Sequence, residues 1–93
     1  MYKLLPIGSV VMIDPEKKEK IMIIGRLMRN EEGGEVYDYC GCLAPFGIQS
    51  QDQIKLFNHK DLTRLLFIGY QDEEELQFAL AAAMQREKAQ STT

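Results

Sequence analysis

Two thiols and one imidazole are the side chains of this chain best suited to do chemistry. Cys40 and Cys42 stand one residue apart, and His59 is the single histidine among 93 residues. A thiolate paired with a histidine is the pattern of nucleophilic catalysis, and sulfur and nitrogen ligands together suit zinc. A structural zinc site takes four such ligands, however, and the chain offers three. We therefore expect no bound metal or cofactor.

The spacing of the cysteines also argues against a redox role. On a strand, residues i and i+2 point to the same face with Cα atoms about 6.6–6.8 Å apart, at the far limit of disulfide geometry. Redox motifs of the thioredoxin type place two residues between their cysteines. We expect Cys40 and Cys42 to be free thiols that pack as small apolar residues. We expect His59 in a cap region, solvated or bonded to the backbone, and not as a catalytic base.

The acidic run 72–75 is a third chemical candidate, because Ca²⁺ binds carboxylates. The run lacks the alternating Asp/Asn spacing and the central glycine of a calcium loop. Asp72 followed by Glu75 instead fits the spacing of a capping box, and acidic side chains stabilise a helix N-terminus by about 0.3–1 kcal/mol each. We expect a helix over about residues 72–88, followed by a frayed tail at 89–93.

The strand that carries the thiols also carries two tyrosines. Tyr37 and Tyr39 share one face of this strand, and the other face carries Asp38, Cys40 and Cys42. Either the aromatic row packs against the terminal helix, or it forms a partner-binding patch, because tyrosine is enriched at protein interfaces. An inward-facing Asp38 carboxylate would need a partner of its own.

The elements that position these residues predict an α+β fold. It consists of a small, mostly antiparallel sheet of about five strands, strongly curved or barrel-like, followed by one C-terminal amphipathic helix. Runs of β-branched residues between turn signals mark the strands. We expect strands at 8–13, 20–28, 35–43, 54–57 and 64–69. The stretch 30–34 predicts a hairpin loop, and Asn58 followed by Asp61 predicts a capped helical turn.

The expected helix offers two apolar lines. Four residues recur on one face at helical spacing: Leu76, Leu80, Ala83 and Met84. We expect this face to cover the sheet. A second line, off this face, contains Phe78, Ala81 and Ala82. It could meet the helix of another protein.

Composition limits the remaining possibilities. The formal net charge of −3 argues against nucleic acid as the main partner, because phosphate binding needs a basic face. No run reaches the roughly 18–20 apolar residues that span a bilayer, so we expect no membrane insertion. The opening Met1–Pro6 is too short for a signal peptide, and two unpaired cysteines suit a reducing compartment. We expect one cytoplasmic domain over residues 1–93.

Three blocks of sequence together resemble a known family. They are residues 5–11 with 23–26, residues 37–39 with Gly41 and 45–47, and residues 57–59 with Asp61 and 67–74. The pattern is similar to the small domain of unknown function encoded beside LXG-type toxins in the type VII secretion loci of Gram-positive bacteria. The resemblance implies a cytoplasmic accessory protein, a chaperone or adaptor for a cognate LXG effector. It assigns no catalytic residues, and Cys40 and Cys42 lie outside its motif.

The resemblance favours a non-enzymatic protein-binding module. We expect its binding surface to involve nine residues: Tyr37, Asp38, Tyr39, Pro45, Phe46, Asn58, His59, Tyr70 and Phe78. One alternative is an immunity protein whose acidic surface masks a basic toxin domain. A more remote alternative is a thiol- or metal-dependent enzyme. A homodimer formed by pairing of the edge strand 64–68 is also open.

Overall fold

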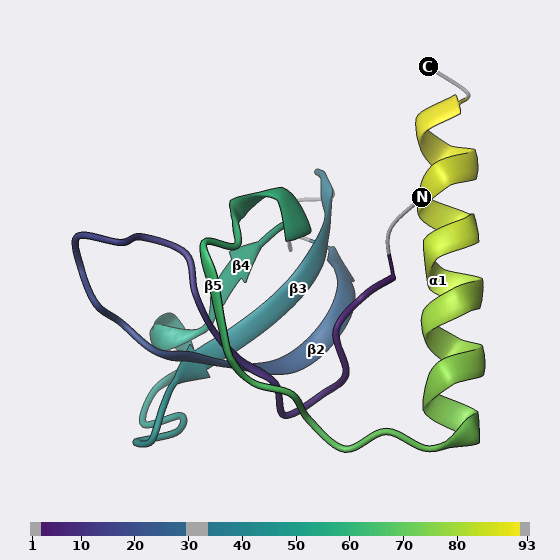
Figure 1. The fold of residues 1–93 in the computed structure, drawn as a ribbon. Helices are drawn as coiled ribbons and strands as arrows, with labels where there is room; N and C mark the ends of the chain where they lie inside the picture. The colour runs from purple at the N-terminus through teal and green to yellow at the C-terminus, as the bar shows by residue number, and fades with distance from the viewer. Residues whose placement is uncertain (1–2, 30–33, 92–93) are drawn as a thin grey trace.

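The computed structural model describes residues 3–29 and 34–91 as a five-stranded sheet followed by one helix (Figure 1). The strands are β1 (Val10–Met12), β2 (Ile21–Arg29), β3 (Val36–Leu43), β4 (Lys55–Phe57) and β5 (Arg64–Phe67). Two 3₁₀ turns, η1 (Gln51–Gln53) and η2 (His59–Asp61), flank β4, and α1 spans Glu73–Ser91. The predicted α+β fold is confirmed. Each strand lies inside its predicted range or extends one residue past it.

Two predicted segments fall partly outside the described residues. The hairpin loop predicted at 30–34 is described only at Gly34, and residues 92–93 of the predicted tail are not described. The helix itself continues to Ser91 instead of ending near Lys88. Within the described residues, no helix is both long enough and apolar enough to cross a membrane.

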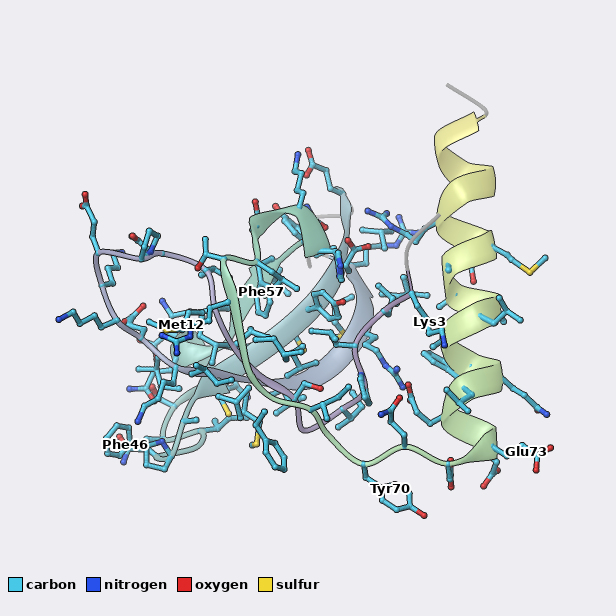
Figure 2. The ribbon with its side chains drawn as sticks, viewed as in Figure 1. Lys3, Met12, Phe46, Phe57, Tyr70 and Glu73 are labelled. Atoms are coloured by element: carbon cyan, nitrogen blue, oxygen red, sulfur yellow. The ribbon has the colours of Figure 1, made fainter. Side chains whose placement is uncertain are left out.

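The sheet is antiparallel throughout and has the order β4-β3-β2-β1-β5. Because β4 and β5 stand at its two ends, the sheet curls but does not close, so the barrel-like alternative is not realised. The curl encloses the core, in which Phe57 is buried (Figure 2). The core cluster contains Leu4, Val11, Ile21, Ile23, Tyr39, Phe57 and Ala82.

A β-bulge in β2 changes which of its residues face the core. Ile23 pairs with Gly41, but Gly25 pairs with Cys40, so the register slips between them. A side chain at Gly25 would place its Cβ 2.7 Å from the Cys40 sulfur, which leaves room only for glycine. Past the bulge, Arg26 pairs with Tyr39 and therefore shares the core-facing side of the sheet with it.

The N-terminal segment 3–9 runs between the sheet and α1 (Figure 1). It is fixed where it crosses Gly69, whose N–H donates to the fully buried Ser9 hydroxyl at 3.0 Å. A Cβ at Gly69 would lie 2.1 Å from the carbonyl oxygen of Ile7, so the two backbones can approach this closely only with glycine there.

The predicted inner face of the helix is wrong. Leu76, Leu80 and Met84 are 44%, 52% and 56% exposed, and of the four predicted residues Ala83 alone is buried. The helix packs inward through small side chains instead, with Ala79 and Ala82 beside Ala83. The second apolar line is also corrected, because Ala82 lies in the core rather than on a partner-facing surface. Two ion pairs between the helix and the sheet determine which face of the helix packs inward.

Candidate functional site

The first ion pair ties the beginning of α1 to β2. Arg26 donates from Nη1 to Glu75 Oε2 at 2.9 Å, and its Nη2 lies 2.7 Å from Oε1. The two side chains are 8% and 11% exposed, so this bidentate pair is shielded from water. The guanidinium also lies 4.3 Å from the ring centroid of Phe78 and donates to the Leu5 carbonyl at 3.4 Å. Arg26 thus joins the sheet, the N-terminal segment and the helix.

The second ion pair ties a later turn of α1 to β3. Arg86 Nε lies 2.8 Å from Asp38 Oδ1, and Arg86 Nη1 donates to the Val36 carbonyl at 3.2 Å. The Asp38 side chain is 1% exposed, and its Oδ2 accepts from the backbone N–H of His59 at 2.9 Å. Asp38 N–H donates to Asn58 Oδ1 at 3.0 Å. The buried carboxylate therefore has the charged partner that its position requires.

These two pairs set the rotation of the helix. Glu75 and Arg86 are eleven positions apart, about three helical turns, so they lie on the same face. Ala79, Ala82 and Ala83 fill that face between them. Their small side chains allow the helix to approach the N-terminal segment closely. The leucines must then turn away from the core, which is why a prediction based on hydrophobicity alone chose the wrong face.

His59 forms part of a hydrogen-bonded chain instead of pairing with a thiol. Its Nδ1 lies 2.7 Å from the Tyr39 hydroxyl, which also accepts from Leu5 N–H at 2.9 Å. A neutral imidazole with an acceptor at Nδ1 satisfies the tyrosine proton. Burial lowers the pKa of His59, and the Asp38 carboxylate opposes this shift. His59 stands in the predicted cap region, and its ring contacts the Tyr39 hydroxyl, a side-chain partner that the prediction did not include.

The predicted turn that begins at Asn58 is confirmed. Asn58 caps η2, and its N–H donates to Asp61 Oδ2 at 2.9 Å, as the spacing of the two residues predicts.

The two cysteines are buried and free, as predicted. Burial raises the pKa of Cys40, and the neighbouring Cys42 raises it further. The Cys40 thiol is therefore protonated at neutral pH and is a poor nucleophile. Among the described residues, no group of three or more His, Cys, Asp or Glu side chains is placed to hold a metal ion.

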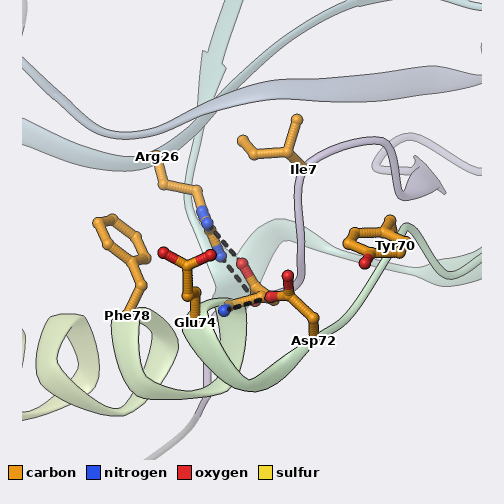
Figure 3. A pocket seen from close by; sticks show the side chains of 7 residues that line it. Ile7, Arg26, Tyr70, Asp72, Glu74 and Phe78 are labelled. Carbon is orange, nitrogen blue, oxygen red and sulfur yellow. Dashed lines mark hydrogen bonds and ion pairs between the residues drawn. The ribbon is translucent and has the colours of Figure 1, made fainter.

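An open cleft of ≈ 610 Å³ lies at the start of α1 (Figure 3). Its lining residues are Ile7, Arg26, Tyr70, Asp72, Glu74, Glu75 and Phe78. Tyr70 and Phe78 stand on opposite sides of the Asp72 and Glu74 carboxylates. Asp72 caps the helix, because its Oδ1 accepts from Glu75 N–H at 2.9 Å. The cleft therefore combines aromatic walls with carboxylates held by a capped helix terminus.

The nine predicted partner-binding residues differ widely in exposure. Phe46 and Tyr70 project from the ribbon and are 71% and 79% exposed (Figure 2). Phe78 is 45% exposed, whereas Asp38 and Tyr39 are buried. The remaining four are half-buried or exposed: Tyr37, Pro45, Asn58 and His59. Of the nine, Tyr70 and Phe78 both line the cleft. Asp38 and Tyr39 hold neighbouring elements in place and do not offer a surface themselves.

Three residues that organise the site were not singled out from the sequence as site residues. They are Arg26, Glu75 and Arg86. One local feature of the sequence could have drawn attention to Arg26: it is a charged residue that follows a glycine in an otherwise apolar strand. In the helix, the corresponding feature is that Glu75 and Arg86 carry opposite charges three turns apart, with alanines between them. Neither signal identifies the partner across the sheet.

Comparison with known proteins places the chain among domains without an assigned role. The family model described as Domain of unknown function (DUF4176) matches residues 4–78. No curated protein and no solved structure gives a significant match.

Proposed function

We propose a function for this chain, which belongs to the DUF4176 family because the family model matches most of its length. The chain acts in the cytoplasm as a non-enzymatic accessory protein, a chaperone or adaptor that binds a cognate LXG effector of a type VII secretion system. The sequence resemblance to domains encoded beside LXG toxins supports the identity of this partner.

The outer stripe of α1, defined as Leu76, Leu80 and Met84, carries the proposal. These residues follow one another at i, i+4 and i+8, so they form a continuous apolar line along the helix. All three are exposed, while the opposite face packs through alanine. A contiguous exposed apolar surface marks an interaction site. An effector helix with its own apolar face is the partner that fits such a line.

The surroundings of the thiols support a binding role over catalysis. Cys40 is buried and protonated, and His59 hydrogen-bonds Tyr39. The shielded ion pairs connect structural elements to one another. These structural contacts explain why the charged side chains are shielded from water, and no bound substrate is needed to explain it.

Co-expression with the neighbouring LXG protein tests this function. We expect the two proteins to elute together in gel filtration and the effector to become more soluble. The variant Leu80→Gln should abolish co-elution, whereas Ile48→Gln should preserve it, because Ile48 is similarly exposed but lies in the loop between β3 and β4. If wild-type protein forms no complex and leaves effector solubility unchanged, the proposal is wrong.

The same complex distinguishes the immunity alternative, which the net charge of −3 favours against a basic toxin domain. Truncated effectors show which region is bound. Binding to the catalytic domain, together with protection of intoxicated cells, would indicate immunity. Binding to the remaining regions without protection would indicate export.

A further inference from the structure

We propose that the cleft at the start of α1 receives an arginine side chain from a partner protein. The cleft is a surface distinct from the outer stripe. Glu74 and Phe78 lie on roughly the opposite side of the helix from Leu80, at about 100° per residue. This inference therefore does not depend on the partner being an LXG effector.

The charges of the cleft select a cation. Arg26 and Glu75 neutralise each other in their bidentate pair, which leaves the Asp72 and Glu74 carboxylates. The N-terminus of α1 contributes roughly +0.5 elementary charge, so a net negative charge of about 1.5 remains. Within the described residues, Glu74 has no ion pair, and its carboxylate is exposed to an incoming ligand.

The aromatic walls select a flat cation that carries apolar character. Tyr70 is 79% exposed, so its ring is accessible to a ligand in the cleft. Phe78 already accepts the Arg26 guanidinium at 4.3 Å, and this contact shows the kind of stacking that the cleft supports. Guanidinium groups stack on aromatic rings and bind carboxylates through paired hydrogen bonds, whereas a lysine ammonium acts as a point charge. Arginine thus matches both features of the lining.

The shape of the cleft suits a side chain that belongs to a longer polypeptide. The cleft is open to solvent, and its lining includes Ile7 on the N-terminal segment and Tyr70 on the connection to the helix (Figure 3). The main chain of a partner can pass along this opening while one side chain enters.

A peptide titration tests the inference with the intact chain. Isotope-labelled protein is titrated with acetyl-Ala-Arg-Ala-amide, and with a matched peptide that carries uncharged citrulline in place of arginine. We expect saturable amide shifts at Tyr70–Phe78 with the arginine peptide only. The Glu74→Gln variant should bind about threefold more weakly, the size of one exposed charge contact. Tyr70→Ala should weaken binding by a similar factor of about three through loss of the cation–π contact.

The control variant is Glu73→Gln, which removes the same charge from the same helical turn at a residue that does not line the cleft. It should leave the affinity unchanged. Absence of saturable shifts, equal shifts with citrulline, or an equal loss in Glu73→Gln would each overturn the inference. Because the titration uses no effector, its outcome is separate from that of the co-expression experiment.

Discussion

The two faces of α1 attach the helix by different means. The inner face combines three alanines with Glu75 and Arg86, whose charged groups reach Arg26 and Asp38 on the sheet. The outer face places its large apolar side chains in solvent. In most surface helices the large apolar residues face the core and the charges face water. Here the arrangement is inverted.

This inversion leaves the outer stripe outside the core cluster. The helix contacts the rest of the domain through small buried side chains and two largely shielded ion pairs. Large apolar residues that do not contribute to the core are then available to a partner. Substitutions can test the two faces separately.

Loss of the Asp38–Arg86 pair should have the largest effect on stability. The Arg86→Met variant leaves the buried Asp38 carboxylate without its cation, and breaking a buried pair in this way costs about 3–5 kcal/mol. Chemical denaturation measures the change. Arg64→Met, at an exposed arginine of β5, should cost less than about 0.5 kcal/mol. Equal costs at both positions would show that the pair does not anchor the helix.

A larger side chain on the inner face should have the second-largest effect on stability. In Ala82→Leu, the added methyl groups enter a site that is 3% exposed and would push α1 away from Leu4, at a cost of about 1–3 kcal/mol. Ala81→Leu adds the same volume on the exposed side and should change stability by less than about 0.5 kcal/mol. Thermal or chemical denaturation compares the pair. A neutral Ala82→Leu would contradict close packing of the helix.

Acidification should have a smaller effect on the stability of the domain, through His59. Burial lowers the pKa of His59 below its ordinary value of 6.5, so the unfolded chain takes up the proton first as the pH falls. The contribution of neutral His59 to stability is complete above pH 6.5 and decreases as the pH falls toward the folded-state pKa. Denaturation at pH 8 and pH 5.5 measures the loss. His59→Gln should reduce this pH dependence, and an unchanged dependence would refute the role assigned to the imidazole.

The sequence predicted the elements that depend on local patterns. The β-branched run at Ile21–Ile24 defined β2, and the spacing of Asn58 and Asp61 predicted the capped turn. The helix face could not be obtained in this way. Arg26 and Glu75 are 49 residues apart in sequence, so their pairing has no local pattern. Without knowledge of that pair, helical periodicity favours the leucines as the packing face.

The bulge in β2 is a second reason why the sequence alone could not predict the site, because it changes the face on which Arg26 lies. Simple alternation places Arg26 on the face opposite Ile23, but the register slip at Gly25 reverses this assignment. The same limit applies to Asp38, whose need for a partner was evident while the identity of Arg86 was not. Local chemistry therefore indicated that buried charges needed partners, and only the fold showed where those partners lie.

The central claim is that the outer stripe is the surface that contacts the effector. Site-specific photo-crosslinking tests it directly, with p-benzoylphenylalanine placed at Leu80 or at Gln85 of the co-expressed protein. Both positions are exposed, and they lie about 140° apart around the helix axis. We predict an effector crosslink from position 80 and none from position 85. A complex that crosslinks from position 85 but not from position 80 would contradict the claim.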